Sequence, residues 1–301
     1  MGKKIYTVIL SYNNFDDTKE CIDSSINNIK NISNTILIVD NGSVDNSFEK
    51  LEELYKEKCV YIKNNKNLGY AGGNNIGIRY AIDHGADYVC ILNNDTVVPM
   101  NFLNPCIEYL EKNDNVAFVG PVIVDYYSGL VQSTGGNIKY NKGEIITINN
   151  NVKLNHIQKN VHCDYVGGAC MVFKTEIIQK LGYLPENYFL FFEETEWCCG
   201  AKKRGFDNVC ISNAFIRHKE SASISKHSGL RTYLLERNRI VFLKRNSPNK
   251  IICAQGILYL FIKYLYYGIF RDKKYFIYLT YWFDGLRNKI DNKTYPFILI
   301  N

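Results

Sequence analysis

Short apolar runs alternate with longer stretches of helical periodicity along the first 120 residues of the chain. Each apolar run ends in polar or glycine residues, which is typical of a buried strand. The runs are Ile5–Leu10, Thr35–Val39, Val60–Ile62, Tyr88–Leu92 and Ala117–Val119. The helical stretches are Asp16–Ile29, Ser43–Lys56, Ala71–His84 and Asn101–Glu111. This alternation predicts an α/β fold in which a mixed, mostly parallel sheet is sandwiched by helices.

The pattern changes after residue 120. Residues 120–160 contain turn sequences such as STGGN and predict hairpins and loops. We expect a strand at Tyr165–Phe173, a helix within Leu184–Phe206 that ends at Gly205, and a short strand at Asn208–Ile211. The remaining residues predict helices. The chain therefore divides into an α/β domain, residues 1–225, and a C-terminal helical appendage, residues 226–301.

Polar residues gather where the predicted strands end. Right-handed crossovers place the carboxyl ends of parallel strands at one edge of a sheet, where ligands of such folds bind. The alternative is an ordinary set of turns, since Asn, Asp and Gly favour turns anyway. The candidate binding residues at this edge are Ser11, Tyr12, Asp40, Asn67, Asn93 and Asp95.

Asp95 is the residue at this edge that suits a hard cation. One carboxylate beside an open cleft can hold Mg²⁺ or Mn²⁺ that also bridges two phosphates. The amide of Asn93 suits a sugar hydroxyl, and the Asp40 carboxylate suits the N3–H of a uracil or thymine ring. Read alone, the Asn-Asn-Asp-Thr run is equally a turn or a helix cap. The segment NLGYAGGNN has neither a dinucleotide-binding nor a P-loop spacing.

An acidic cluster and a histidine lie further along the chain. Glu193, Glu194 and Glu196 repel one another, which raises at least one pKa and suits a general base. The alternative is a solvated helix start, which the helix dipole favours. His218 follows a short strand, in what we expect to be a polar loop, where it suits a metal or phosphate ligand. A lone histidine is more commonly structural or simply exposed.

Charge and cysteine content constrain the setting of the protein. Residues from Arg217 onward hold 16 Lys and Arg against 5 Asp and Glu, a net charge of +11, whereas the preceding residues carry −5. A basic tail suits lipid head groups, diphosphates or nucleic acid. The ten cysteines form no C-x-x-C pair, and no signal peptide is visible, so we expect free thiols in a reducing cytoplasm.

The segment from Ile251 to Lys289 is aromatic and basic. Charged residues interrupt its apolar stretches, which disfavours a membrane-spanning helix. Amphipathic helices on a membrane surface fit better, with aromatic side chains at the interface and cations on lipid phosphates. A helical cap packed on the domain, or on a partner such as a second copy of the chain, is the alternative.

Taken in order, seven motifs resemble those of inverting family 2 glycosyltransferases of GT-A fold. The similarity covers about residues 4–225 and is greatest to bacterial rhamnosyltransferase-like members. Each motif alone is weak, but their co-occurrence is specific. The motifs are VILSYNN, VDNGSVDNS, NLGYAGGNN, LNNDT, YVGGACMVF, FFEETEWCCGAKKRGF and RHKESAS.

The resemblance implies roles at the matching positions. It makes Glu194 the catalytic base. It places the nucleotide of the donor on Ser11, Tyr12, Asp40, Asn67, Asn93 and Asp95. It assigns the acceptor to Gly167, Gly168, Glu193 and Glu196. It gives the divalent cation, Mg²⁺ or Mn²⁺, to Asp95 and His218.

Two positions depart from the family pattern. Asn93 replaces the first aspartate of the D-x-D motif, so the metal site has one charge fewer. Glu194 stands where the base is usually aspartate, and its extra methylene extends its reach by about 1.5 Å. The family pattern still implies a single displacement that inverts the sugar, with Glu194 removing the proton of the acceptor hydroxyl.

The partners implied are a UDP- or dTDP-sugar, with dTDP-rhamnose as one candidate, and a glycan or lipid-diphosphate-linked acceptor in bacterial surface polysaccharide synthesis. We expect a cytoplasmic enzyme held at the inner face of the plasma membrane. The alternative is a nucleotide- or RNA-binding module recruited by the basic helices. The tail aromatics lie in apolar helical runs rather than on an exposed sheet, so we expect no nucleic-acid partner.

Overall fold

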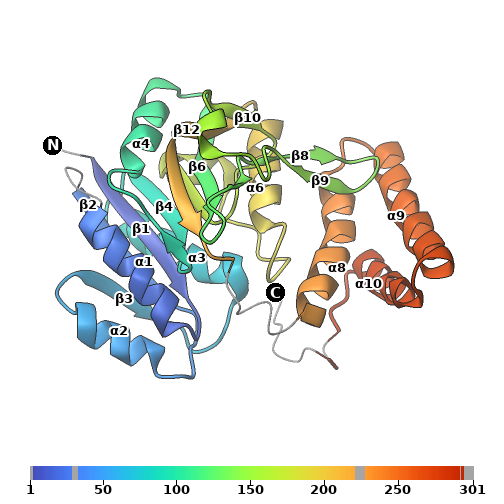
Figure 1. Ribbon diagram of the computed structural model, residues 1–301, viewed down its shortest axis with the longest axis horizontal. Coiled ribbons are helices and arrows are strands. Elements are labelled where there is room, and N and C mark those ends of the chain that lie inside the picture. Colours follow the sequence, from blue (N-terminus) through green and yellow to red (C-terminus); the bar gives the residue numbers. More distant parts are fainter. Residues whose placement is uncertain (1–2, 29–32, 221–227, 292, 295–301) are drawn as a thin grey trace.

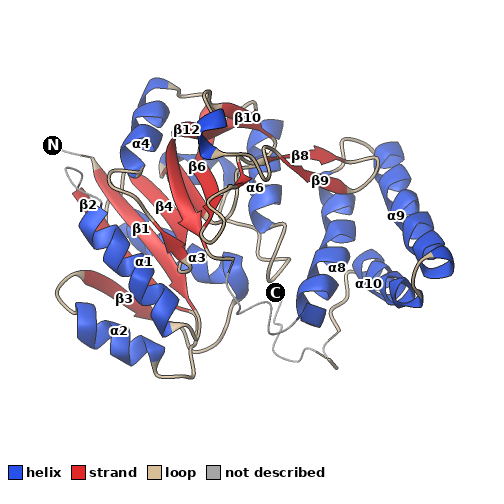
Figure 2. Cartoon of the chain, in the orientation of Figure 1, coloured by secondary structure: helices blue, strands red, loops and turns tan. Residues whose placement is uncertain are grey.

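The computed structural model describes residues 3–28, 33–220, 228–291 and 293–294. Its centre is a mixed sheet, whose strands are red in Figure 2, in the order β10-β12-β6-β11-β4-β1-β2-β3. Outside this order β5 pairs with β12 and β7 pairs with β6. Strands β1, β2, β3, β4, β6 and β12 run parallel, and β11 inserts antiparallel between β4 and β6. The predicted mixed, mostly parallel sheet is thus confirmed.

The bounds of the elements follow the sequence pattern closely in the first half. The predicted strands correspond to β1 (Lys4–Ser11), β2 (Ser33–Asp40), β3 (Cys59–Lys63), β4 (Tyr88–Asn93) and β6 (Val116–Asp125). The predicted helices correspond to α1 (Phe15–Asn28), α2 (Ser47–Tyr55), α3 (Gly69–Asp83) and α4 (Leu103–Lys112).

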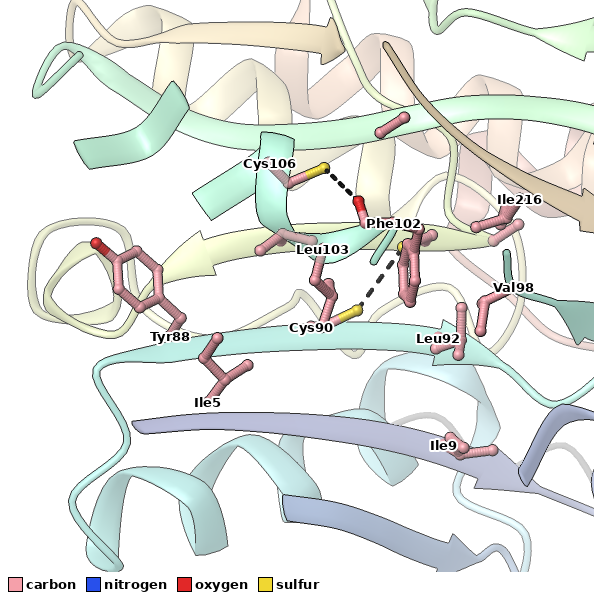
Figure 3. Packing of buried hydrophobic residues seen from close by; sticks show 14 of the residues in the cluster. Ile5, Ile9, Tyr88, Cys90, Leu92, Val98, Phe102, Leu103, Cys106 and Ile216 are labelled. Carbon is pink, nitrogen blue, oxygen red and sulfur yellow. Dashed lines mark hydrogen bonds between the residues drawn. The ribbon is translucent and has the colours of Figure 1, made fainter. Parts of the chain in front are cut away.

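The two faces of the sheet are covered by different helices (Figure 1). Successive residues of a strand point to opposite faces, so Ile5 and Ile9 pack with α1, α2 and α4, whereas Tyr6 and Val8 pack with α3, α5 (Glu176–Leu181) and α6 (Glu193–Lys203). Figure 3 shows the first of these cores, in which the Cys90 and Cys170 sulfurs lie 3.7 Å apart. All ten cysteines are free thiols, as predicted.

Three expectations about the second half are corrected. The strand β6 continues through Gly120 and Pro121, where the sequence indicated a turn, because the missing Pro121 donor coincides with an irregularity in the pairing to β12. The strand β11 is only Cys170–Lys174, and the glycine-rich segment before it is a loop. The strand β12 (Asp207–His218) is much longer than predicted, so His218 ends a strand rather than lying in a loop.

Smaller elements fill the region between β6 and α6. The strands are β5 (Thr96–Val97), β7 (Val131–Ser133), β8 (Gly136–Lys139), β9 (Glu144–Thr147) and β10 (Val161–Cys163). The hairpin of β8 and β9 reaches from the sheet to the helical lobe (Figure 1). There a Cβ added at Gly143 would lie 2.7 Å from Leu260, and one at Gly256 would lie 2.2 Å from the Tyr140 carbonyl oxygen. The hairpin is therefore in close contact with the C-terminal helices.

The C-terminal lobe contains α8 (Ser228–Asn246), α9 (Lys250–Phe270) and α10 (Phe276–Arg287). The predicted boundary between residues 225 and 226 lies outside the described residues. The helix α9 has 21 residues and, by length and composition, is apolar enough to cross a membrane. Lys263 is the one charged residue in its apolar interior, so the expectation that a spanning helix is disfavoured does not follow from length and composition alone.

Candidate active site

A cavity of about 340 Å³ opens at the carboxyl edge of the parallel strands. It lies where β4 and β12 end and where β11 begins, so three strand termini meet there. Both Asp95 and Glu194, which are 99 positions apart in the sequence, line it. Its full lining is Tyr70, Asn93, Asp95, Gly168, Ala169, Leu190, Phe191, Glu193, Glu194, His218, Glu220 and Arg231.

A chain of polar contacts runs along one wall of the cavity. The Nε2 atom of His218 lies 3.2 Å from Oδ1 of Asp95, and its Nδ1 lies 2.8 Å from Oε1 of Gln132. The Gln132 amide nitrogen donates to Glu220, which also pairs with Arg231 at 3.2 Å. Because the amide nitrogen of Gln132 faces Glu220, its oxygen faces His218 and accepts from a protonated Nδ1.

That tautomer has a consequence for the contact between His218 and Asp95. With Nδ1 carrying a proton, the neutral ring presents a lone pair on Nε2 to a carboxylate oxygen, and two acceptors repel at 3.2 Å. A positive charge between the two atoms, either a proton on Nε2 or a metal ion, removes this repulsion. The contact therefore fits either an ion pair with a protonated imidazole or two ligands of one metal ion.

The three glutamates of the acidic cluster occupy different environments. Burial, followed by the neighbouring Glu194 carboxylate, raises the pKa of Glu193 well above its usual value. The buried Oε2 of Glu193 has no hydrogen-bond partner among the described residues. Burial also raises the pKa of Glu194, against hydrogen bonds from its own and the Thr195 backbone N–H. The expected rise in pKa is found, with desolvation rather than repulsion as its main cause.

Glu196 behaves oppositely and does not line the cavity. Burial alone would raise its pKa, but hydrogen bonds from Arg245, Tyr188 and Asn246 outweigh this and hold the pKa below the usual value. The guanidinium of Arg245 approaches at 2.8–3.1 Å, and the Asn246 amide donates at 2.6 Å. The structure therefore places Glu196 in a contact between α6 and α8 rather than beside Glu194.

The two predicted acceptor glycines lie one residue apart but differ in position. Gly168 lines the cavity, and a Cβ added there would lie 3.4 Å from Cγ of Glu194. Its carbonyl accepts a hydrogen bond from the Tyr70 hydroxyl at 2.6 Å. Gly167 does not line the cavity, and its Cβ would clash with Ile123 at 2.4 Å. Gly167 thus has a packing reason to be glycine.

The predicted nucleotide residues lie along the same edge, outside the cavity lining apart from Asn93 and Asp95. The buried Asp40 accepts from the backbone N–H of Gly42 and Ser43 through Oδ2, and its Oδ1 has no partner among the described residues. Asp40 pairs in register with Ser11 on the adjacent strand.

The other three predicted nucleotide residues differ in how available they are. The hydroxyl of Ser11 is buried against Thr18 at 3.1 Å, whereas the Tyr12 side chain is exposed. The Asn67 side-chain oxygen is already engaged, since it accepts from the Asn41 amide of the loop after β2 and from the backbone N–H of Gly69. Of these side chains Tyr12 is therefore open to a ligand, whereas the unpartnered Oδ1 of Asp40 is covered and a ligand would reach it only after the surrounding loops move.

Several lining residues were not predicted from the sequence. Tyr70 and Phe191 lie inside motifs that were recognised and Leu190 directly precedes one, but no pattern of polarity marks them as exposed to a cavity. Arg231 lies in the segment assigned to the C-terminal appendage. Glu220 is the last residue of the RHKESAS motif that the structure describes. The one feature of the sequence that could have indicated Arg231 is that it is a basic residue shortly after the RHKESAS motif.

The profile of the family described as "Glycosyl transferase family 2" matches residues 6–182, more than half of the chain. The chain belongs to this family. As a family 2 glycosyltransferase it is a sugar-transferring enzyme, and the nucleic-acid-binding alternative is not favoured.

Two curated relatives cover most of the chain. The chain is 24% identical over 277 residues, 86% of each chain, to a "dTDP-rhamnosyl transferase RfbF" of Shigella flexneri. It is 26% identical over 245 residues to a "Low-salt glycan biosynthesis hexosyltransferase Agl10" of Haloferax volcanii, covering 80% of this chain and 75% of the relative. Both names agree with the family, and the first agrees with the predicted rhamnosyltransferase-like branch.

Solved structures agree on the fold. The mannosyltransferase PcManGT from Pyrobaculum calidifontis, in complex with GDP-Man and Mn²⁺, superposes with a TM-score of 0.60 at 11% identity, over 97% of this chain and 88% of that one. GalNAc-T7 with UDP, GalNAc and Mn²⁺ also gives 0.60, at 15% identity, over 72% of this chain and 44% of that one. This family 2 glycosyltransferase therefore has the predicted GT-A fold.

Proposed function

We propose that the cavity transfers a sugar from a nucleoside diphosphate to an acceptor hydroxyl, with inversion at the anomeric carbon. The observation that carries this proposal is the convergence of Asp95 and Glu194 on one cavity of about 340 Å³. A volume of this order accommodates a sugar ring between a group that binds the diphosphate and a group that accepts a proton.

In the proposed reaction Glu194 is the general base. The acceptor oxygen forms a bond to the anomeric carbon from one face as the bond from that carbon to the diphosphate oxygen breaks on the other. The proton of the acceptor hydroxyl passes to Glu194, and the electron pair leaves with the nucleoside diphosphate. The raised pKa of Glu194 makes the carboxylate a stronger base than an exposed one.

The donor set beside Glu194 fits a divalent cation. Asp95 Oδ1 and His218 Nε2, which lie 3.2 Å apart, are the two protein atoms that would hold the ion. No cluster of three His, Cys, Asp or Glu side chains is present in the described parts of the chain, so diphosphate oxygens and water would complete the coordination. When bound, the ion would neutralise charge on the leaving diphosphate.

The proposed donor is a UDP- or dTDP-sugar, and similarity to a dTDP-rhamnosyl transferase supports dTDP-rhamnose as the first to test. The unpartnered Oδ1 of Asp40 is an acceptor suited to the N3–H of either pyrimidine. The apolar wall formed by Leu190 and Phe191 suits a deoxysugar better than a fully hydroxylated one.

We also propose that α9 and α10 rest on an anionic phospholipid surface, where a glycan acceptor linked to a lipid diphosphate would be found. The exposed face of α9 carries apolar side chains along its length, and its opposite face packs on the lobe through Gly256, Leu260, Tyr264 and Gly268. Because that packing spans the helix, surface contact fits better than spanning. The exposed Arg271 and Lys273 lie at the end of the apolar face.

The test uses the full chain with UDP-, dTDP- and GDP-sugars, with Mg²⁺ or Mn²⁺ and with chelator. We expect turnover of a uracil or thymine donor, release of the corresponding nucleoside diphosphate, and loss of both in Glu194→Gln. Preference for a guanine nucleotide would contradict the role of Asp40. Full activity of Glu194→Gln would contradict the proposed mechanism.

A further inference from the structure

The loop that leads into Glu193 and Glu194 has an unusual backbone. Phe189, Phe191 and Phe192 have φ values of 67°, 71° and 80°, in the left-handed region that residues other than glycine rarely adopt. Phe191 lines the cavity, and Phe192 is the last residue before α6. Three such residues in four positions need outside support, because the isolated chain favours other conformations.

That support comes from hydrogen bonds to successive carbonyl groups of the loop. The side-chain amide of Asn238, on α8, lies within donating distance of the carbonyl oxygens of Tyr188, Leu190 and Phe191, at 3.0, 2.8 and 3.2 Å. The remaining carbonyl, of Phe189, accepts from the Tyr70 backbone N–H at 2.8 Å. Every carbonyl from 188 to 191 is thus fixed by a group from outside the loop.

The orientation of the Asn238 amide is itself fixed. Nη1 of Arg237 donates to its oxygen at 2.7 Å, which leaves the NH₂ group facing the loop. Both side chains are buried, at 0% and 1% exposure. The Arg237 guanidinium also donates to the carbonyl oxygen of Lys289 at 3.0 Å and to the side-chain oxygen of Asn288 at 3.2 Å. A buried guanidinium with several acceptors is costly to leave unpaired, so the arrangement is rigid.

Residues along the whole length of one face of α8 contact the acidic cluster or the loop and cavity beside it. Arg231, Asn238 and Arg245 are seven residues apart, which is about two helical turns, so they share that face. Arg231 lines the cavity with its guanidinium 5.7 Å from the centre of the Phe191 ring. Arg245 holds the Glu196 carboxylate one turn beyond Glu193. The C-terminal lobe, which the sequence indicated as an appendage, thus contacts the cavity that Glu193 and Glu194 line, through Arg231, and contacts Glu196 through Arg245.

We infer that Asn238, oriented by Arg237, is a positioning residue that sets Glu194 in the cavity by holding the carbonyls of residues 188, 190 and 191. The C-terminal lobe is then part of the active site, because its helix α8 holds the loop that leads to Glu194, in addition to the membrane contact proposed for its outer face. The role of Glu194 as base rests on the proposed function, whereas the attachment of the loop does not. The rival is a buried polar pair that stabilises the whole fold without a local effect on the loop.

The test compares Asn238→Ala and Asn238→Asp with Asn249→Ala in the full chain. The Asp variant keeps the shape but turns an acceptor toward three carbonyl oxygens. Asn249 is a matched control, because its side chain caps α9 by accepting from the Ile252 N–H and lies away from the loop. Hydrogen–deuterium exchange of the peptide spanning residues 186–196 is measured together with kcat and the Kd for UDP and dTDP.

For both Asn238 variants we expect exchange in the loop to rise by at least about tenfold while β1 and β4 keep their protection. We expect kcat to fall by about a hundredfold, with nucleotide Kd little changed, since a misplaced base affects the reacting geometry. Asn249→Ala should match the wild type in both. If Asn238→Ala does not fold, Asn238→Ser, which retains one donor, should show the same changes at a smaller size.

The inference is overturned if loop exchange in the variants equals that of the wild type, or if protection is lost evenly across the sheet. An Asp variant that matches the wild type would likewise show that shape alone is needed. If the wild type neither binds a nucleotide nor turns over a donor, the proposed function fails, but the exchange experiment still decides whether Asn238 holds the loop.

Discussion

The imidazole Nε2 of His218 lies 3.2 Å from Oδ1 of Asp95, although His218 ends β12 and Asp95 lies in the short connection between β4 and β5. The pairing of β12 with β5 brings them together, since His218 is in register with Thr96, the residue after Asp95. Their contact is therefore a property of the sheet and not of a flexible loop. It gives the clearest structural argument for cation binding in this glycosyltransferase.

We predict that Asp95→Asn and His218→Ala each weaken Mn²⁺ binding by about tenfold or more, because each removes one of two protein ligands. Isothermal titration of Mn²⁺ in the presence of UDP or dTDP measures this directly. Asp114→Asn, which removes an exposed carboxylate paired with Lys174 outside the cavity lining, serves as the control. Unchanged Mn²⁺ affinity in both variants would show that the pair does not ligate the ion.

Replacement of Glu194 tests the base. Glu194→Gln keeps the size of the side chain and removes its basicity, so kcat should fall by about 10²- to 10⁴-fold. Glu194→Asp should keep measurable activity, because only the reach of the carboxylate is shortened. Initial rates of nucleoside diphosphate release measure both. Equal loss in the two variants would indicate a positional role and argue against proton transfer.

The pH dependence of the same rates follows from the environment of Glu194. Its pKa is raised above the ordinary value of 4.5 by burial, and the base must be ionised to act. The ascending limb of kcat/KM should therefore lie above pH 4.5 and should be absent from the residual rate of Glu194→Gln. A limb at or below the ordinary glutamate value would contradict the burial of this carboxylate in solution.

Glu193 should make stability depend on pH. Its pKa is raised well above 4.5, so between that value and the raised one the folded state binds more protons than the unfolded state. The free energy of unfolding then falls as pH rises, by up to about 1.4 kcal/mol per pH unit. Glu193→Gln stays neutral and should gain stability over the wild type as pH rises, as measured by urea unfolding at several pH values. A difference independent of pH would contradict this.

Membrane contact is tested by charge on the exposed face of α9. Leu258→Glu with Ile262→Glu should reduce sedimentation with anionic phospholipid vesicles, since both side chains are more than half exposed on that face. Val44→Glu with Leu54→Glu adds the same charge to exposed apolar positions on the α/β domain and should bind as the wild type does. Concentration-dependent dimerisation without vesicle binding would assign the face to a second copy of the chain.

The strands of the first half could be predicted because each is a continuous apolar run bounded by polar residues, as a sheet buried on both faces requires. The same rule failed at β12, where Ser212 and Asn213 interrupt the run at an irregularity in its pairing. It failed at β6 because Gly120 and Pro121 indicate a turn when read locally. Local composition does not reveal that a neighbouring strand tolerates such an interruption.

The residues of the candidate site could likewise be predicted only in part. Asp95 could be located from the sequence because it follows a buried strand at the carboxyl edge of the sheet, and Glu194 because it lies in an acidic cluster inside a recognised motif. Glu196 looked equivalent to its neighbours, yet its partner Arg245 lies 49 residues away, and only tertiary packing shows that the carboxylate is already paired. Asn238 was missed for the same reason, since a buried amide in a helix has no local pattern of its own.

The contact of the β8–β9 hairpin with α9 bears on the engineering of this enzyme. Gly143 and Gly256 leave no room for a side chain on either partner, so hairpin and helix fit only as a matched pair. A chimera that takes its last 70 or so residues from a homologue must import residues 136–147 as well. We therefore expect acceptor preference to transfer only when residues 136–147 and the C-terminal helices are exchanged together.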